Sequence, residues 1–127
     1  MTDLPPHWHA YSWTGHERPA DSDRNNMASA TPPLETAHWL RKSVKPEATW
    51  PVPEGAEQAY AWLRAQLEEH PRAAHDLPYE PQMEYAADCL ARGADVVWGY
   101  YSERGRYISR TLVACPRAGE RCPAPPA

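Results

Sequence analysis

Phenylalanine is absent from this chain of 127 residues, and the sequence has one Ile and two Lys against eleven Arg. The codons of these scarce residues are AT-rich, which indicates a GC-rich bacterial genome. Without Phe, six Trp and seven Tyr supply the large aromatic side chains. Each of these rings carries a polar atom that needs a partner when it is buried, so such residues suit amphipathic surfaces.

Long hydrophobic runs are also missing. No stretch approaches the roughly 20 apolar residues that span a bilayer, and the first residues lack the basic and apolar regions of a signal peptide. The three cysteines, Cys89, Cys115 and Cys122, are an odd number, which favours a reducing compartment over a disulfide framework. We expect a cytoplasmic protein without a membrane partner. A Cys115–Cys122 disulfide in the C-terminal tail is the less favoured alternative.

The length supports one small domain, residues 1–127, with a modest core. Hydrophobic content is 42%, and 15 prolines with a mean hydropathy of −0.77 predict long irregular stretches. The net charge is −4, but residues 104–127 hold 5 Arg and 1 Glu, whereas residues 1–103 hold 8 basic and 16 acidic side chains. An acidic total and an isoelectric point near 5.8 argue against a nucleic-acid partner.

Hydrophobic periodicity and the positions of Pro and Gly predict the order of the elements. We expect a short strand over 7–13, a flexible loop over 15–31, helices over 31–45, 54–70 and 81–93, a β-hairpin over 96–115, and a frayed Pro/Ala-rich tail over 117–127. The fold class is α+β, with about three helices and a C-terminal antiparallel hairpin. Because an isolated hairpin is only marginally stable in water, we expect the N-terminal strand or dimerisation to extend it to a larger sheet.

The hairpin has two chemically different faces. A three-residue turn, 103–105, places Ser102 opposite Arg106 and uses Gly105 for the positive φ. One face is then apolar apart from a single Arg, which we expect to stack on Trp98, and packs on the helices. The other face is smaller, more polar and wet. The pairs on the first face are Val96–Leu112, Trp98–Arg110 and Tyr100–Ile108, and those on the second are Val97–Thr111, Gly99–Ser109 and Tyr101–Tyr107.

We predict a ligand-binding notch at Gly99, where a missing side chain between two aromatic residues opens the wet face. Tyr and Arg around a notch are favoured chemistry for contacts with peptides and proteins. The predicted ligand-binding residues are Tyr101, Tyr107, Arg106, Gly99, Trp98 and Arg110.

Other candidate sites carry weaker signals. His7 and His9 form an H-x-H pattern that would aim both rings to one side of a strand, with His16 and Glu17 nearby, but too few ligands are evident and we assign no metal site and no cofactor. Glu80, Glu84 and Asp88 recur on one helix face, which favours a solvated surface over acid–base catalysis. We expect Cys89 to be a core residue. We assign no catalytic residue.

These observations favour a homodimeric binding module for a short peptide or peptide-like natural product. Whether it is an enzyme stays open; a catalytic form would be a cofactor-free tailoring enzyme of specialised metabolism that preorganises its substrate. The first alternative is a protein-facing inhibitor or adaptor. The second, less favoured, is a β-ribbon nucleic-acid-binding protein that uses Arg104, Arg106 and Arg110.

Overall fold

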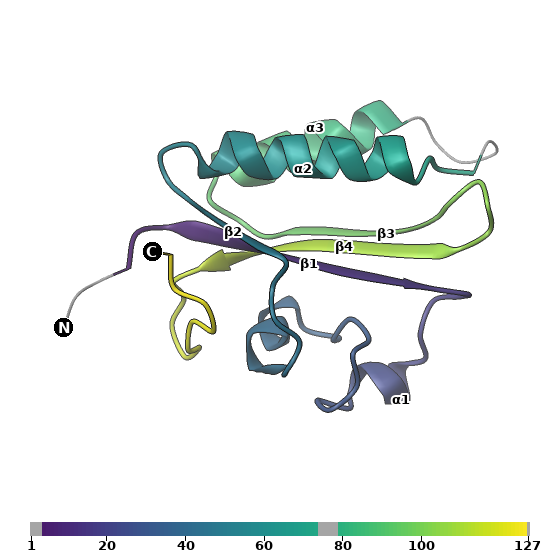
Figure 1. Ribbon diagram of the computed structural model, residues 1–127, viewed down its shortest axis with the longest axis horizontal. Coiled ribbons are helices and arrows are strands. Elements are labelled where there is room, and N and C mark those ends of the chain that lie inside the picture. The colour runs from purple at the N-terminus through teal and green to yellow at the C-terminus, as the bar shows by residue number, and fades with distance from the viewer. Residues whose placement is uncertain (1–3, 74–78, 127) are drawn as a thin grey trace.

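The computed structural model describes residues 4–73 and 79–126 and confirms an α+β architecture. A four-stranded antiparallel sheet carries two long helices on one face and irregular segments on the other (Figure 1). The elements in chain order are β1 His7–Gly15, α1 Asp21–Arg24, the 3-10 helix η1 Thr36–Arg41, β2 Ala48–Pro51, α2 Gly55–Glu69, α3 Tyr79–Ala91, β3 Val96–Tyr101 and β4 Tyr107–Cys115.

The strand order is β2-β1-β4-β3, so the predicted N-terminal strand joins the hairpin and becomes a central strand. The predicted register of the hairpin is confirmed at all six pairs, from Val96–Leu112 to Tyr101–Tyr107. At the turn, the Ser102 N–H donates to the Arg106 carbonyl over 2.8 Å. Gly105 has φ 78°, a conformation that glycine adopts without steric cost.

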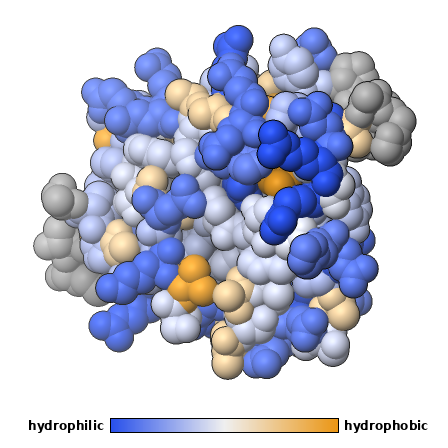
Figure 2. All heavy atoms as spheres, turned by 45° about the vertical axis from the view of Figure 1, so that its right-hand side comes forward, coloured by the Kyte–Doolittle hydropathy of each residue, from blue (hydrophilic) through white to orange (hydrophobic). Residues whose placement is uncertain are grey.

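Helices α2 and α3 begin and end close to the predicted positions and cover the apolar face of the sheet. Leu63 of α2, Val96 of β3 and Leu112 of β4 are fully buried between these layers. Cys89 belongs to the same core. On the face shown in Figure 2, strongly hydrophobic residues appear as small, separate spots among hydrophilic ones, as expected when the apolar side chains are used in the core.

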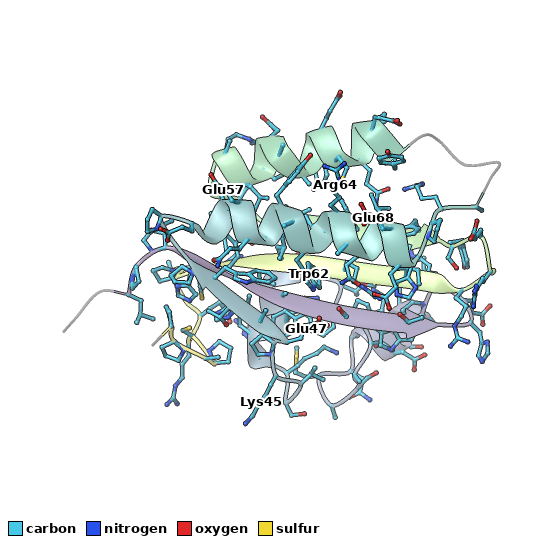
Figure 3. All side chains as sticks on the ribbon, turned by 45° about the horizontal axis from the view of Figure 1, so that its top comes forward. Lys45, Glu47, Glu57, Trp62, Arg64 and Glu68 are labelled. Atoms are coloured by element: carbon cyan, nitrogen blue, oxygen red, sulfur yellow. The ribbon has the colours of Figure 1, made fainter. Side chains whose placement is uncertain are left out.

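Hydrophilic side chains cover the outer surfaces of the helices. Glu80, Glu84 and Asp88 are exposed on α3, as expected for a helix face in contact with solvent. In the middle of α2, Trp62 reaches from the helix toward the sheet, and its indole N–H donates to Glu47 over 3.3 Å (Figure 3). Among the described residues, no helix has both the length and the apolar character that a bilayer crossing requires.

The helix predicted over 31–45 is wrong. The only regular element in that segment is η1. The residues immediately before and after η1, Glu35 and Lys42, have extended backbone. A residue before proline avoids the helical region, so Pro33 disfavours a helical conformation at Pro32, the first residue after the predicted N-cap. The aromatic ring of Trp39 instead stacks on Tyr11 of β1, with ring centroids 4.7 Å apart, and this packing holds η1 against the sheet.

Arg110 does not make the predicted stacking contact. It is buried on the helix-facing side of β4, where its guanidinium donates to Gln66 Oε1 over 2.6 Å and to the Trp13 carbonyl over 3.1 Å. Buried charge requires such hydrogen bonds. The face predicted to be wet also differs from expectation, because Ser109 and Thr111 are buried beneath the segment that contains η1.

The two-layer core makes Trp98 a test of the packing. Its ring is 3% exposed, and Trp98→Ala should lower the free energy of unfolding by about 3–5 kcal/mol because a large cavity remains. Denaturant unfolding measures this. Tyr79→Ala, at a side chain that is 53% exposed, should change it by about 0.5 kcal/mol or less. Equal losses in the two variants would contradict this assignment of the core.

Candidate metal centre

The pairing of β1 with β4 brings four metal-binding side chains together at one end of the sheet. His7 pairs directly with Cys115, and His9 lies two residues farther along β1, so both imidazoles lie on the same face. Cys122 reaches this face from the segment after β4. The four ligand atoms of His7, His9, Cys115 and Cys122 all lie within 4.8 Å of one another.

The separations fit the edges of a coordination tetrahedron. His7 Nε2 lies 3.2 Å from His9 Nε2 and 3.4 Å from Cys122 Sγ, and His9 Nε2 lies 3.3 Å from Cys122 Sγ. Around tetrahedral zinc, bonds of about 2.0–2.1 Å to nitrogen and 2.3 Å to sulfur separate two nitrogens by about 3.3 Å and nitrogen from sulfur by about 3.6 Å. These three atoms therefore stand close to the corners of one face of such a tetrahedron, and the Cys115 sulfur lies within 4.8 Å of each of them.

Each imidazole is oriented by a contact at its other nitrogen. His7 Nδ1 lies 2.6 Å from the Pro5 carbonyl oxygen, which can only accept, so Nδ1 carries the proton and Nε2 presents a lone pair. His9 Nδ1 lies 2.8 Å from the Thr49 hydroxyl of β2. Such partners fix the tautomer and the ring plane of metal-binding histidines. Both Nε2 atoms consequently point into the cluster.

Burial sets the protonation of the cluster. Desolvation, together with the nearby His7, lowers the pKa of His9 to about 4, so this imidazole is neutral, as a metal ligand must be. Desolvation, together with Cys122, raises the pKa of the Cys115 thiol to about 12. Both Cys115 and Cys122 are free thiols in the structure. A bound cation would replace their protons, because thiolate sulfur is the form that ligates.

The donor set favours zinc. Two thiolates and two imidazoles in a tetrahedral arrangement are typical of structural Zn²⁺ sites. Four protein ligands leave no open position for substrate or water, unlike catalytic zinc, which keeps one. The arrangement is therefore suited to holding chain segments together and not to activating water.

Ion pairs hold the segment after Pro116, for which the composition predicts fraying, against the body of the domain. Arg117 donates to both carboxylate oxygens of Asp95 over 3.0 Å. Arg41 of η1 makes a two-pronged contact with Glu120, with distances of 2.8 and 2.6 Å. Both contacts lie just before Cys122 in the sequence and help to bring its thiol to the two histidines.

The six predicted ligand-binding residues lie on two opposite faces of the sheet and at the hairpin turn. Trp98 and Arg110 face the helices and are buried, whereas Gly99, Tyr101 and Tyr107 lie on the opposite face of the sheet. Arg106 lies exposed beside the turn. The notch at Gly99 is filled by Tyr107, since a Cβ at Gly99 would clash with the Tyr107 hydroxyl. The ring of Tyr101 lies 5.3 Å from that of Tyr107.

Sequence reasoning recognised His7 and His9 as a possible pair, and Cys115 and Cys122 as a possible pair, but did not connect them. His16 and Glu17, considered with the histidines, are exposed and lie outside the cluster. No local signal in the sequence joins the two pairs, because they meet only through the pairing of β1 with β4, which places His7 opposite Cys115.

Comparisons with protein-family models, curated proteins and solved structures find no match to this chain.

Thr49 provides a test of the orienting contacts. Thr49→Val removes the hydroxyl beside His9 Nδ1 and should weaken zinc binding by roughly 10- to 100-fold, the usual effect of losing such a partner. Competition with a chromophoric chelator measures this affinity. Thr49→Ser keeps the hydroxyl and should restore most of the affinity. Equal affinities for the Val and Ser variants would show that the contact does not position His9.

Proposed function

We propose that the chain is a zinc-binding protein in which the metal fastens the C-terminal segment to the central strands of the sheet. The observation that carries this proposal is the convergence of His7, His9, Cys115 and Cys122 within 4.8 Å. Two further observations support a metal site: the contacts that orient both imidazoles, and separations close to those around a tetrahedral ion.

The energetics support a structural role for the ion. Without a metal, the Nε2 atoms of His7 and His9 contact only each other and the Cys122 sulfur, which are weak partners compared with a bound cation. With a metal, the sites at residues 7, 9, 115 and 122 become one cross-link between the first and last parts of the described chain. Because an unfolded chain does not present this site, the binding free energy becomes folding free energy.

The reducing, cytoplasmic compartment predicted from the cysteine count belongs to the same proposal. Such a compartment keeps thiols reduced, and reduced Cys115 and Cys122 are the forms that can ligate the ion.

A second proposal retains the homodimeric peptide-binding module predicted from the sequence. A groove of about 310 Å³ lies between α3 and the edge strand β3, and Gln82, Tyr85 and Val97 are among its described lining residues. Tyr85 and Val97 are 46% and 48% exposed. An extended peptide can add to an exposed sheet edge through main-chain hydrogen bonds, with side chains entering an adjacent groove. A tailoring enzyme that preorganises a peptide substrate would use the same surface.

The protein-facing and nucleic-acid-binding alternatives have less support. Arg104 and Arg106 are exposed at the hairpin turn, but two arginines provide few phosphate contacts. An inhibitor or adaptor would need a docking surface for its partner protein, and on the face shown in Figure 2 the hydrophobic residues form only small, separate spots.

The zinc proposal predicts one equivalent of metal that depends on Cys122. Elemental analysis of the purified protein should give one zinc per chain, and replacement by cobalt should give the intense visible absorption of a tetrahedral, thiolate-bound ion. Cys122→Ser should lose this metal and should be cleaved by trypsin at Arg117 and Arg121 faster than the wild type, because the segment is released. Cys89→Ala, which removes a cysteine outside the cluster, should keep one equivalent. A metal-free wild type, or retention of the ion by Cys122→Ser, would refute the proposal.

The peptide proposal has its own test. Native mass spectrometry of tagged protein taken from its host should show a dimer that carries an additional mass of about one to three kilodaltons, a size that one cleft can bury. Val97→Lys, at the exposed edge, should lose this mass and keep its zinc. A clean, unliganded species would oppose peptide binding and leave the zinc proposal intact.

A further inference from the structure

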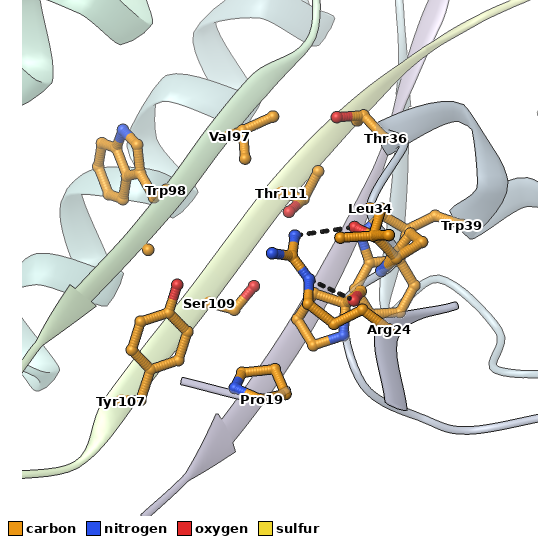
Figure 4. A pocket seen from close by; sticks show the side chains of 13 residues that line it. Pro19, Arg24, Leu34, Thr36, Trp39, Val97, Trp98, Tyr107, Ser109 and Thr111 are labelled. Carbon is orange, nitrogen blue, oxygen red and sulfur yellow. Dashed lines mark hydrogen bonds between the residues drawn. The ribbon is translucent and has the colours of Figure 1, made fainter. Parts of the chain in front are cut away.

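A closed-in polar cavity lies at the other end of the face that carries the metal cluster. The segment that contains α1 and η1 covers β4 there and leaves a space of about 80 Å³ (Figure 4). Its floor is formed by Tyr107, Ser109 and Thr111, alternate residues of β4 that face the same side. Pro33 and Trp39 contribute to its walls.

The floor hydroxyls lack protein partners. Ser109 and Thr111 are 4% and 2% exposed, yet within the described part of the chain no hydrogen bond is formed by their hydroxyls or by that of Tyr107. In Figure 4 the Ser109 and Thr111 hydroxyl groups lie on the side of β4 that faces the Arg24 guanidinium. Hydroxyl groups without a protein partner are free to accept or donate hydrogen bonds to a molecule bound in the cavity.

Arg24 gives the cavity a positive charge. Its Nε donates to the Pro32 carbonyl over 3.1 Å and its Nη2 to the Pro33 carbonyl over 3.0 Å. These two bonds hold the guanidinium in place and leave Nη1 without a bond to any described residue. The described lining contains no carboxylate. A fixed guanidinium next to hydroxyl donors is suited to an oxyanion.

Size and charge narrow the class of anion. Water occupies about 30 Å³ per molecule in the liquid, so the space holds a molecule of only a few non-hydrogen atoms. One guanidinium balances one negative charge, whereas a doubly charged phosphate would leave charge buried without compensation. The proline and tryptophan walls suit a short hydrocarbon part.

We propose that this cavity binds a short monocarboxylate, with the carboxylate at Arg24, Ser109 and Thr111 and the alkyl part against Pro33 and Trp39. The site is separate from the zinc cluster, and its occupation does not depend on whether zinc binds. Because the ligand has few atoms, the expected dissociation constant lies in the millimolar range.

Titration of the zinc-loaded protein with acetate, propionate, butyrate and hexanoate, followed by NMR, tests this proposal. Saturable shifts should appear for the shorter acids and disappear for hexanoate, which is too long. Arg24→Gln should weaken propionate binding at least about tenfold, the effect expected from the loss of a charged hydrogen-bond partner. Arg64→Gln removes a guanidinium that is exposed on α2 and should leave binding unchanged.

Because Arg24 also braces the covering segment, Ser109→Ala and Thr111→Val provide a second pair of variants that leave that bracing intact. Each should weaken propionate binding severalfold while the zinc content and the fold, followed by the NMR spectrum, are preserved. The proposal is overturned if no acid gives saturable shifts and the cavity holds water only, if inorganic phosphate binds more tightly than propionate, or if binding survives both Arg24→Gln and Ser109→Ala.

Discussion

The antiparallel pairing of β1 with β4 is the interaction on which the rest of this structure depends. The two strands are the central pair of the sheet and run in register from His7–Cys115 to Gly15–Tyr107. Because side chains alternate along each strand, this register separates two surfaces. The even-numbered residues of both strands face α2 and α3, and the odd-numbered residues face the segment around η1 and the C-terminal segment.

That second surface has three regions in sequence order. At one end, His7, His9 and Cys115 supply most of the candidate zinc centre. In the middle, Tyr11 and Val113 form a small apolar cluster with Trp39. At the other end lie the polar cavity and Arg24. The apolar middle fixes the covering segment, and this allows a segment with little regular structure to close a cavity at one end and lie beside the metal ligands at the other.

The sequence predicted the helix-facing side of this protein well and the opposite side poorly. Helical periodicity in α2 and α3 and the alternation in β3 and β4 are local signals, and the hairpin register followed from the glycine of the hairpin turn, Gly105. The segment before β2 has no such periodicity, and its path is determined by the contact of Trp39 with Tyr11, 28 positions earlier in the chain. Propensity alone cannot reveal a contact of that kind.

The candidate zinc centre was hidden for the same reason. Each histidine and cysteine was visible, but the ligands come from three segments that meet only after β1 pairs with β4 and the C-terminal segment turns back.

X-ray absorption at the zinc edge on the purified protein tests this centre most directly. The account predicts two nitrogen ligands at about 2.0–2.1 Å and two sulfur ligands at about 2.3 Å. A shell made only of oxygen and nitrogen, or one with a different number of sulfur atoms, would contradict it.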